Sequence, residues 1–179
     1  MASLVAENYS SALFELANEE NKLDAVKNEL NEINGVLNEY PDLYRILTHP
    51  LIEKSEKKDT LLKVFDGMDI SVSSFVRLLI DKNRFNAFND IVLEFNRKYN
   101  KANNIDVAYV TSAKELDETQ INSLKAMLEK KTGKTVEIKT AVDEDLIAGL
   151  RVRINDELLD NSVATKLAKM KDAVNKTAI

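Results

Sequence analysis

The spacing of apolar residues changes once along this chain, near residues 101–104, and that change limits the possible folds more than any other feature. Before it, apolar residues recur every three or four positions, as on helices with a buried face. After it, residues 105–111 and 135–142 alternate with a period near two, as in strands. The sequence therefore predicts a mainly α protein, with a six-helix bundle over residues 1–104 and a small α+β domain over residues 105–179.

Two predicted helices carry more apolar surface than one buried face needs, so each is expected to lie between neighbours or under a partner. One is the first helix, over residues 2–17, and the other is the fifth. The first helix has a face made of Val5, Tyr9, Ala12 and Leu16, widened by Ala6, Leu13 and Ala17, with Phe14 nearly opposite. The fifth helix holds Val72, Phe75, Val76, Leu78, Leu79 and Ile80.

Helix ends are marked by residues with special backbone properties. Pro41 suits the first turn of a third helix, and Pro50 ends it. A fourth helix is predicted over residues 53–65, and either Ser71 or Ser73 is expected to cap the fifth. Each of the other helices has one apolar face that is expected to point inward. On helix two it is Leu23, Val26, Leu30, Ile33 and Leu37, and on helix three Leu43, Ile46 and Leu47. On helix four it is Leu61, Leu62 and Phe65, and on helix six Phe88, Ile91, Val92, Phe95 and Tyr99.

The second half contains one strongly signalled helix between strands. Asp117 and Gln120 form a capping box and Gly133 ends the helix, whose inner face is Ile121, Leu124 and Leu128. Further strands are expected over residues 150–154 and 157–159, joined by a turn at residues 155–156. A last helix is predicted from Val163, Leu167, Met170 and Val174, which recur at helical spacing.

Composition excludes several classes of function. The net charge of −5 argues against a nucleic-acid scaffold, and the absence of Cys excludes disulfides and thiolate metal sites. No apolar run approaches the ~20 residues of a membrane span, and the first residues do not resemble a signal peptide. We therefore expect a chain that is cytosolic or bound to a membrane through other proteins, with no cofactor, no metal and no catalytic residues.

Four groups of residues look chemical but have simpler interpretations. Gly133-Lys134-Thr135 matches the end of a phosphate-binding loop, but it follows a helix and precedes a strand, which is the reverse of what that loop needs. Residues 143–145 read as an acidic surface turn rather than a Ca²⁺ or Mg²⁺ site. His49 has no evident acid–base partner, and Lys54, Lys57 and Lys58 alternate with glutamates as on a solvated helix face.

Three segments carry a resemblance to a known family. Residues 9–17 read Tyr-Ser-Ser-Ala-Leu-Phe-Glu-Leu-Ala and resemble the Tyr-Ala-x-Ala-Leu-Phe-x-x-Ala signature of bacterial ATP synthase delta subunits, the family of mitochondrial OSCP. Residues 142–152 resemble the family's Val-Asp-Pro-x-Leu-Ile-Gly-Gly-x-x-Val, with Glu144 for Pro and Ala148 for the first Gly. Residues 159–163 resemble Ile-Asp-Gly-Ser-Val, with Asn161 for Gly. The resemblance covers nearly the whole chain.

The resemblance implies a non-catalytic stator subunit of F-type ATP synthase, present in one copy at the cytoplasmic face of the cell membrane. Its N-terminal domain would bind the N-terminal helices of alpha subunits on the catalytic head, and its C-terminal domain the end of the b-subunit stalk. Rotation would thereby be coupled to proton transport and ATP synthesis. No direct membrane insertion and no nucleic-acid binding are implied.

The family's groove for the alpha-subunit helix lies on the first and fifth helices. The resemblance carries this role to Tyr9, Ala12 and Leu78, with Leu13, Phe14 and Phe75 as further partner-binding candidates that could instead belong to the core. In the C-terminal domain the signature positions are Gly149, Asp160 and Ser162. For these we expect structural roles: a close approach, a turn and a helix cap.

Two alternatives belong to other functional classes. One is a nucleic-acid-binding α+β protein with a helical regulatory domain, which would be retained on heparin at moderate salt. The other is a small acyl- or nucleotidyl-transferase, which would be stabilised by nucleotides. The acidic balance argues against the first, and the lack of a complete phosphate loop, of any Cys and of a paired His argues against the second.

Overall fold

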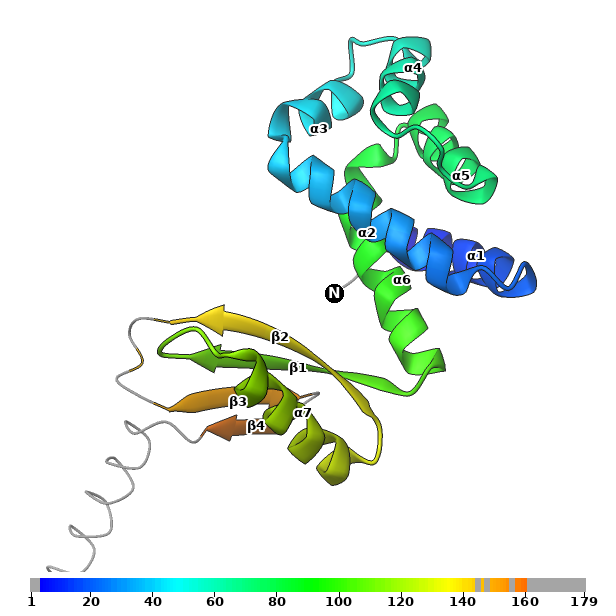
Figure 1. The fold of residues 1–179 in the computed structure, drawn as a ribbon. Coiled ribbons are helices and arrows are strands. Elements are labelled where there is room, and N and C mark those ends of the chain that lie inside the picture. The colour runs from blue at the N-terminus through cyan, green and yellow to red at the C-terminus, as the bar shows by residue number, and fades with distance from the viewer. Residues whose placement is uncertain (1–3, 144–145, 147–148, 155–156, 161–179) are drawn as a thin grey trace, which may run out of the picture. The chain divides into compact units, whose positions relative to one another are not determined.

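The computed structural model describes residues 4–143, 146, 149–154 and 157–160. Contacts divide the chain into two compact units, Met1–Tyr99 and Asn100–Ile179. The first unit is helical and the second contains the sheet (Figure 1). The predicted mainly α chain with a helical bundle and a small α+β part is confirmed. The predicted last helix, the turn at residues 155–156 and Ser162 lie outside the described residues.

The helical unit is built from six α-helices and one short 3₁₀ turn. Their bounds are α1 Leu4–Glu19, α2 Leu23–Glu39, α3 Pro41–Thr48, α4 Lys54–Val64, α5 Ile70–Asp81, η1 Phe85–Ala87 and α6 Phe88–Ala102. The predicted starts and ends lie within a few residues of these, except that the sixth helix begins with the 3₁₀ turn.

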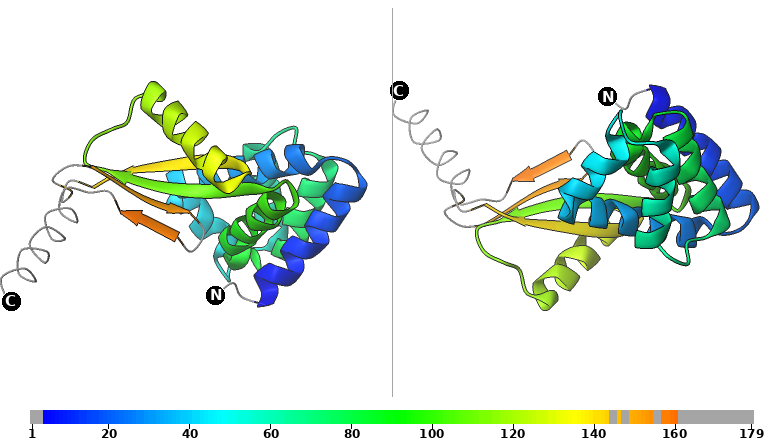
Figure 2. Two further views of the ribbon diagram at one scale, coloured as in Figure 1. Left: turned by 90° about the horizontal axis from the view of Figure 1, so that it is seen from below. Right: turned by 90° about the horizontal axis from the view of Figure 1, so that it is seen from above.

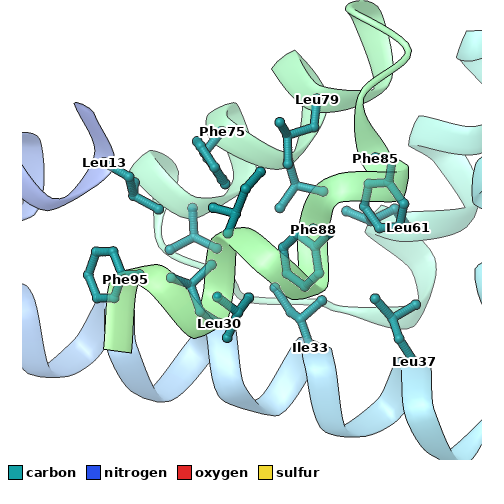
Figure 3. Packing of buried hydrophobic residues seen from close by; sticks show 14 of the residues in the cluster. Leu13, Leu30, Ile33, Leu37, Leu61, Phe75, Leu79, Phe85, Phe88 and Phe95 are labelled. Carbon is teal, nitrogen blue, oxygen red and sulfur yellow. The ribbon is translucent and has the colours of Figure 1, made fainter. Parts of the chain in front are cut away.

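One apolar core joins these helices. In Figure 3, labelled side chains from α1, α2, α4, α5, η1 and α6 point toward one another. Phe85 and Phe88 stack with ring centroids 5.3 Å apart, and Phe88 and Phe95 are fully buried. Completely burying a side chain of this size stabilises the fold by about 1.5–3 kcal/mol relative to leaving it exposed, so the phenylalanines of α6 dominate the core.

The buried face of α1 differs from the predicted one. Its core residues are Ala6, Ser10, Leu13 and Ala17, whereas Ala12 and Leu16 are exposed. The buried positions are mostly small, so α1 can approach its neighbours closely. The hydroxyl of Ser10 donates to the Glu7 carbonyl at 3.0 Å, which removes the cost of burying it.

The start of α5 also differs from the prediction. Neither Ser71 nor Ser73 is the N-cap, because both lie inside the helix. The cap is Asp69, whose carboxylate accepts the Ser71 N–H at 2.9 Å. Asp69 further accepts a bond from Lys22 at 2.9 Å. A carboxylate accepts from both the free N–H of a helix start and a neighbouring ammonium, and its negative charge strengthens both bonds relative to those of a neutral hydroxyl.

Two expectations about α3 and α4 are wrong. Ile46 is partly exposed, and of the predicted inward residues of α3 only Leu47 is buried. Lys57 is not on a solvated face, since its side chain is only 6% exposed. It lines a small cavity with Thr48 and Ile80, near the ends of α3 and α5.

The α+β unit is a four-stranded sheet with one described helix against it (Figure 2). Its elements are β1 Ile105–Ser112, α7 Glu118–Thr132, β2 Thr135–Val142, β3 Leu150–Ile154 and β4 Glu157–Asp160. The strand order is β2-β1-β3-β4. The first two strands are parallel, as a connection through a helix allows, and the other pairings are antiparallel.

The ends of α7 follow the sequence signals. Asp117 accepts the Gln120 N–H at 2.7 Å, while Gln120 accepts the Asp117 N–H, so the predicted capping box is present. Gly133 ends the helix with φ of +70°, a conformation that glycine adopts without strain. Leu124 and Leu128 then pack on Ala108, Val110 and Val152 of the sheet.

Candidate partner-binding surface

Helices α1 and α5 lie side by side and antiparallel within the helical unit. At one end, the Ser71 hydroxyl donates to the carboxylate of Glu20 at 2.9 Å. Toward the other end, the rings of Tyr9 and Phe75 meet edge to face, with centroids 6.2 Å apart. The start of α5 is therefore next to the end of α1, and the two helices run in opposite directions.

The Tyr9 side chain is held in place from two directions. Its ring rests on Phe75, and the Arg84 guanidinium lies 5.6 Å from the ring centroid on a cation–π contact. Arg84 also donates to the Tyr9 hydroxyl at 3.4 Å. Tyr9 is half-buried, so it marks the border between the core and the exposed strip.

The six predicted partner-binding residues fall into two groups. Leu13 and Phe75 are buried, at 2% and 8% exposed, and both belong to the core of the helical unit. Phe14 packs against Phe95, with ring centroids 5.8 Å apart. The remaining three are open to solvent to different degrees: Tyr9 is half-buried, Ala12 is exposed and Leu78 is 42% exposed.

We call Val5, Tyr9, Ala12, Leu16 and Leu78 the α1–α5 surface. The four residues of α1 follow one another at spacings of four, three and four, so they form one stripe along the helix. Leu78 lies one turn beyond Phe75, the residue that touches Tyr9. The surface is apolar and flanks a core that is already complete, so its residues remain available to another molecule.

Charged residues fix the edges of this region. Lys22 bridges Glu20 and Asp69 at 3.4 and 2.9 Å. The hydrogen bond from Lys22, followed by the one from the Ser71 N–H, lowers the pKa of Asp69 below its usual value. At the other end of α5, the hydrogen bond from Lys58 lowers the pKa of Asp81. These bonds hold the ends of α5, and hence the position of Leu78.

Sequence reasoning missed part of this arrangement. The spacing predicted that Val5, Tyr9, Ala12 and Leu16 share one stripe, but it did not show whether that stripe is buried or exposed. The contact between Arg84 and Tyr9 carries no signal in the sequence, because the two residues lie far apart along the chain.

The signature positions of the α+β unit lie where its sheet begins and ends. Gly149 precedes β3 and has φ of +102°, in the region that favours glycine. Asp160 is the last residue of β4 and pairs in register with Arg151 of β3.

The remaining groups that look chemical have structural partners. Lys134, in the apparent phosphate-loop match, donates to Asp106 at 3.1 Å, and its segment runs from α7 into β2. His49 accepts the Leu51 N–H at its Nδ1 atom at 3.2 Å, within the turn after α3. Among the described residues, which exclude Glu144 and Asp145, no three acidic or histidine side chains gather as metal ligands.

The helices of the described residues also bear on membrane insertion. None of the helices in residues 4–143 combines the length and the apolar character that crossing a membrane needs.

Exposed apolar residues beside a packed core, as on the α1–α5 surface, are typical of proteins that bind other proteins. Comparison with known proteins gives the family. The profile described as ATP synthase delta (OSCP) subunit matches residues 5–174. The chain is 35% identical to the ATP synthase subunit delta of Clostridioides difficile over 98% of both chains. It is 38% identical to that of Desulfitobacterium hafniense strain DCB-2 over 96% of both.

The chain therefore belongs to the ATP synthase delta (OSCP) subunit family, whose members are non-catalytic components of the ATP synthase. A solved chain of the Toxoplasma gondii mitochondrial ATP synthase hexamer shares the fold, with a TM-score of 0.74 at 20% identity, covering 96% of this chain and 98% of that one. Family membership favours the resemblance over the nucleic-acid-binding and transferase alternatives.

Proposed function

We propose that this chain is the stator subunit that links the catalytic head of an F-type ATP synthase to its peripheral stalk. The observation that carries the proposal is the α1–α5 surface, an apolar strip beside a complete core. The N-terminal helices of alpha subunits would bind this strip, and the C-terminal end of the b subunit would bind the α+β unit. The chain would stop the head from turning with the rotor.

The geometry of the strip suits an amphipathic helix. Ala12 is small and exposed, so a partner backbone can come close to α1 at that point. Leu16 and Leu78 offer side chains that can enter the spaces between partner residues. Tyr9, held by Phe75 and Arg84, provides a rigid aromatic contact that loses little entropy on binding.

The load on a stator sets the affinity that the function needs. A stable pair of proteins usually buries ~1,200–2,000 Å² in total. Resistance to torque requires that the partner dissociates slowly, so we expect nanomolar affinity. This corresponds to a binding free energy of about −12 kcal/mol. The exposed residues of α1 and α5 supply the apolar centre of such an interface.

The α+β unit would hold the stalk, with Gly149 and Asp160 shaping the ends of the sheet that support this contact. Ser162, as the proposed cap of a following helix, would act in the same structural way. The protein would lie peripherally at the cytoplasmic face of the membrane, in the F1 sector, with one copy in each complex, and would couple rotation to proton transport.

The experiment is titration of full-length protein with purified catalytic head, comparing Leu78→Asp and Leu93→Asp. Leu78 belongs to the α1–α5 surface, whereas Leu93 is an exposed leucine of α6. Leu78→Asp would bury an unpaired carboxylate in the interface, so it is expected to weaken binding to the head by about 2 kcal/mol or more, roughly thirtyfold. Leu93→Asp is expected to leave the affinity unchanged. Equal affinities of the two folded variants for the head would refute the assignment.

A further inference from the structure

A small cavity in the helical unit has a buried lysine in its wall. Its volume is about 330 Å³, and its walls come from the end of α3, from α4, from the end of α5 and from the connection into η1. Lys57 lines it with only 6% of the residue exposed. Asn83 and Asn86 line the same cavity and are exposed. The lysine therefore lies deep in the cavity, and the two asparagines lie at its opening.

The ammonium of Lys57 has no counter-ion in the described part of the chain. With the described residues it forms neither a hydrogen bond nor an ion pair. Among the described residues that line the cavity, Lys57 is also the only one that carries a charge. Buried charges in proteins are normally paired, because removing an unpaired charge from water costs free energy. The cavity therefore holds a positive charge that no neighbouring carboxylate balances.

The end of α5, which forms one wall, does not need this lysine. The carbonyls of residues 78–80 accept the backbone N–H groups of residues 82–84 at 2.8–3.1 Å. The next carbonyl, that of Asp81, accepts a hydrogen bond from the Lys54 ammonium at 2.7 Å. Because these acceptors already have donors, the ammonium of Lys57 remains available to a ligand that enters the cavity.

The surroundings of the cavity add further positive charge. Asp81 follows the lining residue Ile80, and Lys58 pairs with its carboxylate at 2.6 Å. The hydrogen bond from Lys58, and then the charges of Lys54 and Lys82, lower the pKa of Asp81. The acidic side chains of α4 are exposed, and none of them lines the cavity. Positive charge is thus in excess at this end of the helical unit, which favours the approach of an anion.

We propose that Lys57, Asn83 and Asn86 form a binding site for a small oxyanion of the phosphate type. The ammonium supplies the charge, and the two side-chain amides supply N–H donors at the opening. Phosphate has more acceptor oxygens than a carboxylate, so it can accept from all three groups at once. A volume of about 330 Å³ is at the lower end of the ~300–1,000 Å³ range of small-molecule sites, which favours an ion over a nucleotide.

A bound anion would join α4 to the connection between α5 and η1. Arg84, which contacts Tyr9, belongs to the same connection as Asn83 and Asn86. Because the anion binds the folded protein and not the unfolded chain, it would also stabilise the helical unit. The site is separate from the α1–α5 surface in its residues and in its chemistry.

The experiment uses full-length protein and inorganic phosphate, added in place of chloride at constant ionic strength. The side-chain NH₂ signals of Asn83 and Asn86 in NMR spectra report on the site directly, and we expect them to shift with saturation. Lys57→Met keeps an unbranched side chain but removes the charge, so phosphate affinity should fall about tenfold or more. Lys63→Met, at an exposed lysine of the same helix, should leave the affinity unchanged.

A second substitution tests the site without removing the lysine. Asn86→Asp places a carboxylate at the opening, where it can pair with Lys57 and repel phosphate. Phosphate should then no longer shift the Asn83 signal. Asn28→Asp adds the same charge at an exposed position of α2 that does not line the cavity, and should leave phosphate binding intact. Unchanged phosphate binding in Asn86→Asp would overturn the inference.

Three other results would also overturn it. Equal phosphate affinities of wild type and Lys57→Met would show that the ion gathers on the general positive surface. Acetate that binds as tightly as phosphate would assign the site to a carboxylate, such as that of a partner side chain. The absence of any saturable shift would show that water alone satisfies the buried ammonium. None of these results bears on whether the α1–α5 surface binds the head.

Discussion

The two units differ in how their described residues surround their cores. In the helical unit, six helices enclose one apolar cluster, and fully buried Phe88 and Phe95 lie within it. In the described part of the α+β unit, α7 packs on the sheet beside a cavity of about 920 Å³. Exposed apolar residues therefore have different surroundings: Leu78 lies outside an enclosed core, whereas Met127 lines the cavity among the described residues of the α+β unit.

The largest expected effect is in the complete core. Phe88→Ala should destabilise the helical unit by about 3–5 kcal/mol, because it removes a fully buried ring and leaves a cavity among tightly packed neighbours. Urea unfolding followed by far-UV circular dichroism measures the loss. A loss below about 1 kcal/mol would mean that the helical core is loosely packed, and the contrast between the units would fail.

Leu128→Ala makes the matching change in the α+β unit. Leu128 is 1% exposed and packs α7 onto the sheet, so its truncation should cost about 2–5 kcal/mol. Because the core of each unit is separate, amide exchange should accelerate in the α+β unit while the slow amides of α2 and α6 keep their rates. Equal acceleration in both units would show that they unfold as one.

A smaller effect is expected when the α1–α5 surface is overfilled. Ala12→Leu adds bulk where a partner backbone would approach, and should weaken binding to the head about tenfold, or 1.4 kcal/mol, without a change in stability. Asn18→Leu is the matched control, since Asn18 is exposed on another side of α1. Similar weakening in both variants would argue for a nonspecific effect of added apolar surface.

The smallest effect should come from the acidic helix caps, of which each unit has one. Hydrogen bonds from Lys22 and the Ser71 N–H lower the pKa of Asp69, and the Gln120 N–H does the same for Asp117. A folded-state pKa below the unfolded value of about 3.9 means that each cap stabilises at higher pH and loses this contribution as pH falls through the folded pKa.

Asn can cap a helix but does not titrate, so it provides the comparison. Below about pH 4, wild type should lose stability more steeply than Asp69→Asn in the helical unit and than Asp117→Asn in the α+β unit. Urea midpoints measured at several pH values test this. Parallel pH profiles for wild type and both variants would contradict it.

The sequence was most informative where one local rule decides the structure. The stripe of α2, the strands over residues 135–142 and 150–154, and the capping box of α7 were predicted correctly. Each depends on spacing within a few residues, so no knowledge of distant neighbours is needed. The fold class was likewise predicted from the change in the spacing of apolar residues, from every three or four positions to every second position.

Features that depend on distant neighbours were mispredicted or missed. Spacing left the core side of α1 undecided, because close helix packing selects small Ala6, Ser10 and Ala17 over larger apolar residues. The burial of Lys57 depends on the ends of α3 and α5, and the Asp69 cap depends on Lys22. Which of the candidate residues on α1 and α5 belong to the core could only be decided from the structure, where Leu13 and Phe75 are buried and Ala12 and Leu78 are exposed.

The most direct test of the stator proposal is a bridging measurement with both partners. The b-subunit stalk is immobilised, full-length protein is bound to it, and purified catalytic head is then added while mass on the surface is recorded. We predict that the head is retained through the wild-type chain, and that Leu78→Asp still binds the stalk but releases the head roughly thirtyfold faster. Release of the chain from the stalk when the head binds would contradict a link formed through two separate surfaces.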